Sequence, residues 1–214
     1  MNSLSTLSGR PVPYLAALAG LGEEGGEVLL GDLHHRGERP APARAWDEKG
    51  LVLLCSSFSK TLAPGYRVGW IAPGRFRERV LQLKSAHTVA TPTLTQMAVA
   101  EFLENGGYDH HLRTLRRQLG CQVQQMSEAV ERHFPAGTRV SRPEGGFVLW
   151  VEKPRGSALE LQEQALERGI SIAPGPIFSA RERYQSFIRL SCGLPWSEQV
   201  ERAVATLGQL AAAL

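Results

Sequence analysis

The sequence predicts an α/β fold followed by a smaller α+β domain, and three observations support this prediction. Residues 51–55 (LVLLC) form a continuous apolar run, which is typical of a strand buried between helices in a parallel sheet. Apolar residues from Leu112 to Phe134 recur every three or four positions, which predicts one long amphipathic helix that ends at Pro135. After Pro135 the pattern changes to short strands and helices.

Several short elements are expected before the long helix. Residues 27–33 (EVLLGDL) predict a short strand, and residues 34–50 predict a loop. The spacing of apolar side chains over residues 76–87 predicts a helix. A second helix is expected to begin at about Thr93 and to end at about Asn105, where two glycines follow.

The C-terminal part of the chain predicts a small α+β domain. Residues 138–152 predict two strands joined by a Gly-Gly turn, and residues 170–175 and 187–193 predict further strands. Ser157 and Ser197 each precede an apolar-periodic stretch and are the predicted N-caps of two helices. We therefore divide the chain into an atypical N-terminal segment (1–30), a partial large domain with the long linking helix (31–135) and a small C-terminal domain (136–214).

The composition argues against several classes of function. The formal net charge is +3 and the Lys and Arg residues are scattered, so we expect no nucleic-acid contact by this chain itself. No apolar run approaches the ~20 residues that a membrane span needs, and the N-terminus lacks a signal-peptide pattern. We expect no membrane contact, and a cytoplasmic protein whose three cysteines are free, buried thiols.

Two histidine pairs, His34-His35 and His110-His111, raise the question of a metal site. Adjacent histidines on a loop or at a helix start point apart, and no cysteine or carboxylate spacing completes a ligand set. Solvated surface histidines are the favoured interpretation, and we predict no metal.

The segment LLCSSFSKTLAPGYRVGW (53–70) contains the candidate chemistry. Lys60 follows the predicted buried strand, at the sheet edge where ligands bind in open α/β folds. A partly desolvated amine there can form a Schiff base with a carbonyl, and the Ser57 hydroxyl and Arg67 guanidinium suit a phosphate. A turn at Pro64-Gly65 would bring Arg67 back towards Lys60. The alternative is a solvated loop lysine near a surface arginine.

Ser57-Phe58-Ser59-Lys60 also matches the Ser-x-x-Lys motif of β-lactamases and penicillin-binding proteins. In those enzymes the motif opens a helix, and Ser-Asp-Asn and Lys-Thr-Gly motifs follow it. Neither companion motif is present here, and Ala63-Pro64-Gly65 interrupts the segment. An acyl-serine enzyme is therefore disfavoured.

The same segment resembles the lysine-loop signature of the class I/II, fold-type I aminotransferases, which use pyridoxal phosphate (PLP). The stretches GDLHHRGERPAPARAWDEKG, PEGGFVLWVE, GISIAPGPIFS and FIRLSCG follow the family's pattern in the same order. The resemblance is greatest to the aminotransferase-like domain of MocR-type regulators, which belong to the GntR family. It implies that the chain is the C-terminal part of a fold-type I PLP-dependent transferase, with PLP as cofactor and a homodimer as the expected assembly.

The resemblance implies a role for each matching residue. Lys60 would hold PLP as a Schiff base and would move the proton between the substrate Cα and C4′ of the cofactor. Ser57 and Arg67 would bind the phosphate. Arg189 would bind the α-carboxylate of the substrate; the alternative is a surface arginine at the end of a strand. The implied reaction is amino-group transfer between an amino acid and a 2-oxo acid.

The N-terminal part departs from the family pattern. The family strand before GDL carries an Asp for the pyridine nitrogen and, three residues later, a Tyr for the ring oxygen; Glu27 and Leu30 stand at these positions. The Gly-rich phosphate turn, the stacking aromatic, the Asn and the regulator's winged-helix domain are not recognisable. We therefore expect an N-terminally truncated chain and leave three functions open: an aminotransferase domain, the effector-sensing half of a transcription regulator, or a catalytically inactive remnant.

Overall fold

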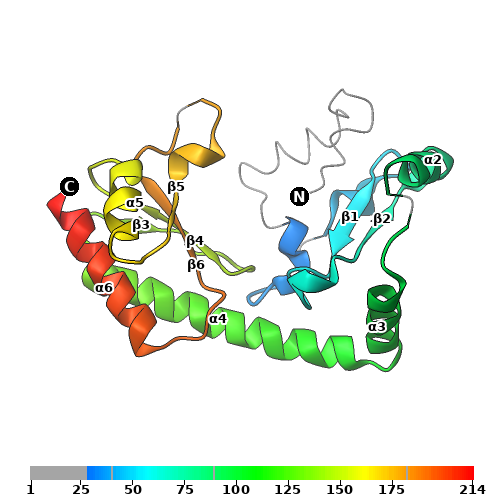
Figure 1. Ribbon diagram of the computed structural model, residues 1–214, viewed down its shortest axis with the longest axis horizontal. Helices are drawn as coiled ribbons and strands as arrows, with labels where there is room; N and C mark the ends of the chain where they lie inside the picture. Colours follow the sequence, from blue (N-terminus) through cyan, green and yellow to red (C-terminus); the bar gives the residue numbers. More distant parts are fainter. Residues whose placement is uncertain (1–27, 40, 89, 182) are drawn as a thin grey trace. The chain divides into compact units, whose positions relative to one another are not determined.

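A computed structural model describes residues 28–214 with the exception of residues 40, 89 and 182 (Figure 1). The chain divides into two compact units, residues 1–116 and 117–214, which we call the N-terminal and C-terminal units. The longest helix, α4 (Gly107–His133), contributes residues to both units. The predicted segment 1–30 lies almost wholly outside the described residues, and the predicted domain boundaries stay predictions.

The described part of the N-terminal unit contains a two-stranded antiparallel sheet. Strand β1 (Leu54–Ser57) pairs with β2 (Gly69–Ala72) (Figure 1). In this pairing Ser57 lies opposite Gly69. The prediction of a strand at 51–55 in a parallel sheet is wrong in two respects, because β1 begins at Leu54 and its described partner is antiparallel. The apolar run indicates that its residues are buried, but it does not determine whether the neighbouring strand is parallel or antiparallel.

The segment before β1 also differs from its prediction. Residues Val28–Leu33 form a 3₁₀ helix instead of a strand, and a second 3₁₀ helix occupies Ala43–Trp46 within the predicted loop. Leu33 is fully buried. Periodicity cannot distinguish a short apolar strand from a short buried helical turn, which explains the wrong assignment.

Two helices follow β2 at the predicted places. α2 spans Arg77–Thr88, and α3 spans Thr93–Glu104. Val99 of α3 packs against Phe58 and Val68 in a buried cluster, so α3 supports the segment between β1 and β2. Other large apolar side chains of α2 and α3 are exposed, namely Leu81, Leu94, Met97 and Leu103.

The C-terminal unit contains a four-stranded antiparallel sheet (Figure 1). The strand order is β3 (Arg139–Val140), β4 (Val148–Glu152), β6 (Phe187–Ser191) and β5 (Ala173–Pro174). Alternate residues of β4 and β6 are buried, as the period of a strand with one covered face requires. These strands confirm the predictions made for this part of the chain.

Three helices cover the buried face of this sheet. Residues of α4, α5 (Ala158–Leu166) and α6 (Glu198–Ala213) join the buried residues of β4 and β6 in one apolar cluster. The predicted N-caps are confirmed: Oγ of Ser157 accepts hydrogen bonds from the backbone N–H of Leu159 and Glu160. Oγ of Ser197 likewise accepts a hydrogen bond from the N–H of Val200.

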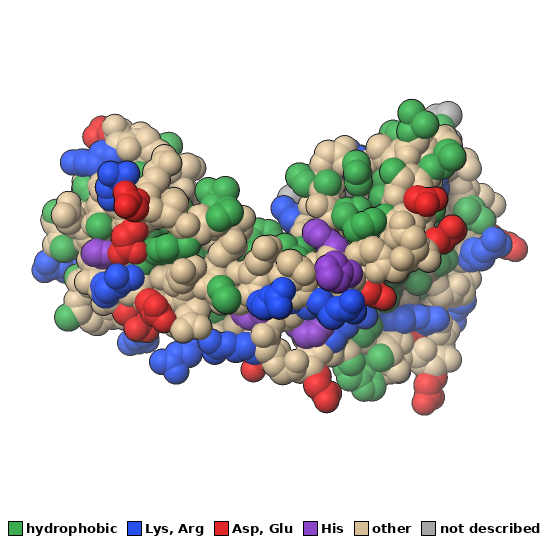
Figure 2. All heavy atoms as spheres, turned by 90° about the horizontal axis from the view of Figure 1, so that it is seen from below, with side chains coloured by type: hydrophobic (Ala, Val, Ile, Leu, Met, Phe, Trp, Pro, Cys, Tyr) green, Lys and Arg blue, Asp and Glu red, His purple; other side chains and the backbone are tan. Residues whose placement is uncertain are grey.

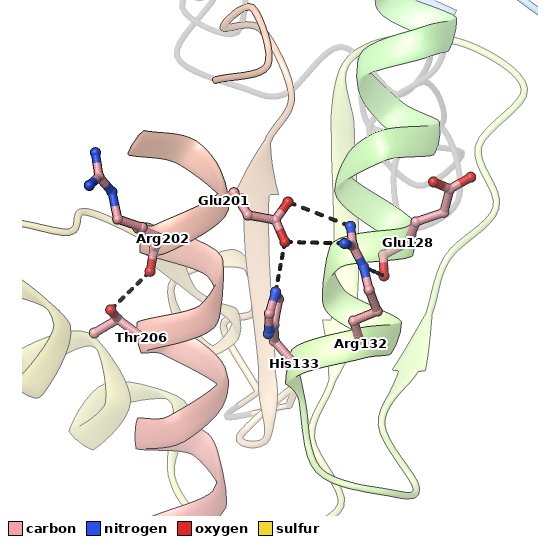
Figure 3. Close-up of polar contacts among 6 residues, drawn as sticks. All are labelled: Glu128, Arg132, His133, Glu201, Arg202 and Thr206. Carbon is pink, nitrogen blue, oxygen red and sulfur yellow. Dashed lines mark hydrogen bonds and ion pairs between the residues drawn. The ribbon is translucent and has the colours of Figure 1, made fainter. Parts of the chain in front are cut away.

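Helices α4 and α6 approach each other closely where α4 ends. Nε2 of His133 lies 2.7 Å from Oε1 of Glu201, and Nη1 of Arg132 lies 3.4 Å from the same oxygen (Figure 3). Gly208 of α6 faces the backbone of His133, and a Cβ atom at this position would lie 2.6 Å from the His133 carbonyl carbon. The contact therefore requires a residue without a side chain at position 208.

We predict that Gly208→Ala destabilises the C-terminal unit. Alanine normally favours a helix by about 1 kcal/mol over glycine. Here the added methyl group would overlap the His133 backbone, and overpacking of this kind costs about 1–3 kcal/mol. The urea midpoint of α-helical circular dichroism should fall, whereas Gln209→Ala, a change at an exposed neighbour in the same helix, should leave it nearly unchanged. An unchanged or raised midpoint in Gly208→Ala would contradict the packing.

Asp47 organises the chain just before β1. Its Oδ2 accepts hydrogen bonds from the backbone N–H of Val52 at 2.7 Å and from Arg44 at 2.7 Å, and its Oδ1 accepts one from the N–H of Lys49 at 3.1 Å. The carboxylate is 6% exposed. These hydrogen bonds, led by the one from Val52, lower the pKa of Asp47 from 3.8 to about 2. The charged carboxylate therefore stabilises the approach to β1.

This pKa shift predicts a pH dependence of stability. The folded pKa lies below the unfolded one, so the Asp47 contribution is complete above about pH 4 and is lost as the pH falls towards 2. Thermal unfolding of Asp47→Asn should show a lower midpoint than the original chain at pH 7, and this difference should shrink between pH 4 and pH 2. Glu48→Gln at the exposed neighbouring position is the control and should show no such pattern. A difference that is constant with pH would exclude the role assigned to the charge.

Candidate functional site

The predicted cofactor residues of the N-terminal unit lie at the end of β1, which is Ser57, and on the loop that follows it. Residues 58–68, which we call the lysine loop, connect β1 to β2 and include Lys60 and Arg67. The backbone N–H of Phe58 donates to the carbonyl of Val68 at 3.0 Å, directly beyond the Ser57–Gly69 pair. The antiparallel ladder therefore brings Arg67 back beside the end of β1, as the sequence predicts for the turn at Pro64-Gly65.

Backbone hydrogen bonds and a close approach of the two strands hold both ends of the lysine loop. The N–H groups of Leu62 and Ala63 donate to the carbonyl of Phe58 at 2.8 and 3.1 Å. A Cβ atom at Gly69 would lie 2.9 Å from the Ser56 carbonyl oxygen and 3.3 Å from Cβ of Ser57, so glycine permits the close approach of the two strands. The backbone around Lys60 is therefore held by local hydrogen bonds.

Arg67 has an unusual backbone conformation. Its φ angle is +53°, in the left-handed region that non-glycine residues rarely occupy. It follows the 3₁₀ turn Pro64–Tyr66 and leads into β2. Such strain costs about 1–3 kcal/mol and concentrates at functional sites, so it supports a function for Arg67.

The charge along this segment favours an anion. Ser57, Lys60 and Arg67 are all exposed, so their polar groups can reach a ligand. No Asp or Glu occurs between Glu48 and Glu78. Ser57 and the lysine loop together thus offer a hydroxyl, an ammonium and a guanidinium without a neighbouring carboxylate in sequence, which suits a phosphate.

Thr61, next to Lys60, is tied to the start of α4. The Tyr108 hydroxyl donates to Oγ1 of Thr61 at 3.0 Å, and Nε2 of His111 lies 2.8 Å from the Thr61 carbonyl oxygen. Thr61 is 5% exposed. The interpretation of His111 as a solvated surface histidine is wrong, because its ring nitrogen is used within the protein; His110 is exposed as expected. No sequence signal pairs residues that lie 47 and 50 positions apart.

Arg189 belongs to the C-terminal unit. It lies at the centre of β6, opposite Trp150 of β4 and Ala173 of β5, and it faces away from the apolar cluster that β6 forms with α4, α5 and α6. Its guanidinium carbon lies 4.6 Å from the centre of the Phe178 ring. Trp150 also contacts Phe178, at 5.3 Å between ring centres. Arg189 is exposed, so its hydrogen-bond donors are accessible.

The other candidate groups have different environments. Among the described residues, no group of three or more His, Cys, Asp or Glu side chains could hold a metal ion. The three cysteines are free, but Cys121 is exposed, which corrects the expectation of buried thiols. Burial raises the pKa of Cys192 to about 12. No helix in the described ranges could span a membrane.

A surface hollow of about 390 Å³ lies at the beginning of α6. Trp196, Ser197, Glu198, Glu201 and Arg202 line it, and none of the predicted site residues does. Glu201 is already paired with His133 and Arg132 (Figure 3). The hollow is thus a separate feature of the C-terminal unit.

Relatives of this chain include both regulators and enzymes. The family model described as aminotransferase class I and II matches residues 26–207. The uncharacterized HTH-type transcriptional regulator YdcR of Escherichia coli (strain K12) is 41% identical over 183 residues, which cover 85% of this chain and 39% of that protein. Aromatic-amino-acid aminotransferase 1 of Thermococcus litoralis is 32% identical over 181 residues, which cover 84% of this chain and 43% of that enzyme.

Solved structures share the fold. LysN, an α-aminoadipate aminotransferase of Thermus thermophilus complexed with N-(5′-phosphopyridoxyl)-L-leucine, matches with a TM-score of 0.79 and 30% identity, covering 95% of this chain and 55% of that one. Pyrococcus horikoshii kynurenine aminotransferase in complex with PMP matches with a TM-score of 0.77 and 27% identity, covering 86% and 46%. The predicted α/β, fold-type I class is confirmed. The groups bound by these two relatives, PMP and a phosphopyridoxyl amino acid, belong to the same class of cofactor as the predicted pyridoxal phosphate.

The chain spans about two fifths to half of the length of these relatives. The matched region nevertheless includes the lysine loop, α4 and β6. The match covers most of the chain, and from it we conclude that the chain belongs to the class I and II aminotransferase family.

Proposed function

We propose that this chain binds pyridoxal phosphate through Lys60 and transfers amino groups between an amino acid and a 2-oxo acid. The observation that best supports this proposal is the lysine loop. It holds Lys60 between Ser57 and a left-handed Arg67, in a stretch without acidic residues. The ammonium and guanidinium charges match a phosphorylated aldehyde better than they match a neutral ligand.

The described residues fit this cofactor at its phosphate and aldehyde ends. Ser57 and Arg67 would bind the phosphate, because the ladder brings both to the base of the lysine loop. Lys60 would condense with the aldehyde, with loss of one water molecule. Of the positions predicted to face the pyridine ring, Glu27 lies outside the described residues, and the side chain of Leu30 is also not described.

The remaining roles follow from charge and access. When bound, pyridoxal phosphate supplies an electron sink for a bond broken at the substrate Cα. The Lys60 amine, once released by the incoming substrate amine, would accept the proton from that carbon. Arg189 would bind the substrate α-carboxylate, and its contact with the Phe178 ring leaves the guanidinium edge available.

A second candidate function is effector sensing in a transcription regulator. It is favoured by the identity to YdcR, and by 38% identity to the HTH-type regulator YjiR of Escherichia coli (strain K12). On the face drawn in Figure 2, Lys and Arg side chains occur in separate groups interspersed with Asp and Glu. The sensing proposal rests on the relatives. The third candidate is a catalytically inactive remnant that at most dimerises or packs on another chain. For the first two candidates we propose a cytoplasmic homodimer.

Trapping of the Schiff base tests the cofactor proposal. The protein is incubated with pyridoxal phosphate, reduced with borohydride, digested and analysed by mass spectrometry. Borohydride delivers hydride to the C=N bond and leaves a stable secondary amine. We expect the adduct mainly at Lys60, and far less at the exposed Lys49 and Lys84. An even distribution over these three lysines would refute the proposal.

Arg67 should control the affinity in the same assay. Loss of a charge-assisted phosphate contact in Arg67→Ala should raise the cofactor concentration for half-maximal labelling roughly 10-fold. Arg75→Ala removes another exposed arginine from the same acid-free stretch and should leave the concentration unchanged. Equal behaviour of the two variants would mean that net charge, and not a phosphate site, determines the labelling.

Release of a 2-oxo acid distinguishes an enzyme from a sensor, and a variant of Arg189 tests the substrate site. A transaminase loaded with cofactor should release a 2-oxo acid from an L-amino acid in a single turnover, whereas a sensor should bind the amino acid without releasing one. Arg189→Gln should raise the amino-acid concentration required roughly 10- to 100-fold, without changing the labelling of Lys60. Arg181→Gln, at an exposed position of the same unit, is the matched control.

A further inference from the structure

We infer that Tyr108 and His111 are positioning residues that hold the backbone beside Lys60 through Thr61. The inference rests on the proposed role of Lys60. Its basis is that two side chains from the first turns of α4 bond to both polar groups of a single loop residue, the hydroxyl and the carbonyl of Thr61. The Tyr108 ring also packs against the apolar cluster of Phe58, Val68 and Val99.

The hydrogen-bond chemistry at Thr61 is directional. A carbonyl oxygen can only accept, so Nε2 of His111 must carry the proton in the 2.8 Å contact. Tyr108 donates its hydroxyl to Oγ1 of Thr61 at 3.0 Å, and burial raises the pKa of Tyr108, so the phenol keeps this proton throughout the neutral range. Both α4 side chains therefore act as donors to Thr61.

Tyr108 also contacts the chain on the other side of Lys60, and His111 contacts α3. The Tyr108 ring meets Phe58 edge to face, with ring centres 5.7 Å apart. The His111 ring in turn contacts Phe102 of α3, at 6.1 Å between centres. Phe58 and Thr61 flank Ser59 and Lys60 in the chain, so the backbone of Lys60 is held on both sides while its side chain remains exposed.

Fixing this backbone has a consequence for the chemistry. A lysine that must place its amine at one point loses less entropy when its Cα is already fixed, because only the side-chain rotamers remain to be selected. Thr61 directly follows Lys60 and is buried, so contacts to Thr61 restrict the backbone next to Lys60. Removing its two donors should therefore slow the formation of the Lys60 adduct without changing the charge of the loop.

The test compares variants that remove a donor but keep the ring or the volume. Tyr108→Phe retains the ring beside Phe58, His111→Leu loses the donor, and His111→Gln retains an N–H that can reach a carbonyl. The control is His110→Leu, at the exposed neighbour. Two measurements are made on each: the rate of borohydride-trapped pyridoxal phosphate at Lys60 relative to Lys84, and deuterium exchange of the backbone amides in residues 58–63.

We expect Tyr108→Phe and His111→Leu each to reduce the relative Lys60 rate and the amide protection of residues 58–63 roughly 5-fold, the size that one lost hydrogen bond gives. His111→Gln should restore most of both, and His110→Leu should change neither. Unchanged protection in both donor variants would overturn the inference. A loss of protection that extends equally to the C-terminal unit would also overturn it, since this would indicate general unfolding. If the original chain shows no Lys60 preference, the proposed function fails, and the exchange data alone decide whether α4 holds the loop.

Discussion

The antiparallel pairing of β1 with β2 is the constraint on which the candidate site depends. It places Ser57 opposite Gly69 and closes the lysine loop through the bond from Phe58 to Val68. Without it, Ser57 and Arg67 would be ten residues apart on an open chain, and no common ligand could be expected. Because Gly69 allows the strands to approach, one residue without a side chain is essential to this closure.

Helix α4 contacts both the lysine loop and the core of the C-terminal unit. Its first turns supply Tyr108 and His111 to Thr61, and its later turns supply buried residues such as Val123 and Val130 to the core of the C-terminal unit. One continuous helix thus contacts the lysine loop at its beginning and the core of the C-terminal unit further along. The amphipathic period accounts for the core contacts, since it selects the buried face. The contacts to Thr61 depend on individual polar side chains, which the helix places one turn apart.

The sequence predicted the elements that local rules determine, and it missed those that depend on distant partners. The end of α4, the serine caps of α5 and α6 and the alternation along β4 and β6 follow from periodicity and capping within a few residues. The beginning of α4 at Gly107 does not, because the apolar period begins only at Leu112. The antiparallel direction of β1 does not, because its partner is chosen by the closing of a loop. His111 was assigned to solvent for the same reason: Thr61 lies 50 residues away and carries no motif that indicates a partner. The return of Arg67 towards the end of β1, where Ser57 lies, agrees with the sequence prediction, since the turn at Pro64-Gly65 is local.

The two lysines with the most contrasting environments show why burial alone does not identify a reactive amine. Lys153 is 2% exposed, and its Nζ donates to the carbonyl of Ser157 at 3.0 Å. Burial lowers the pKa of Lys153, opposed by the charge of Glu160. A lowered pKa favours a nucleophile, but this amine lies at the beginning of α5, bonded and shielded from any ligand. Lys60 has the opposite arrangement, with an exposed side chain on a backbone that its neighbours hold. Access combined with a fixed backbone, and not desolvation in the isolated chain, is therefore the property that makes Lys60 the better candidate.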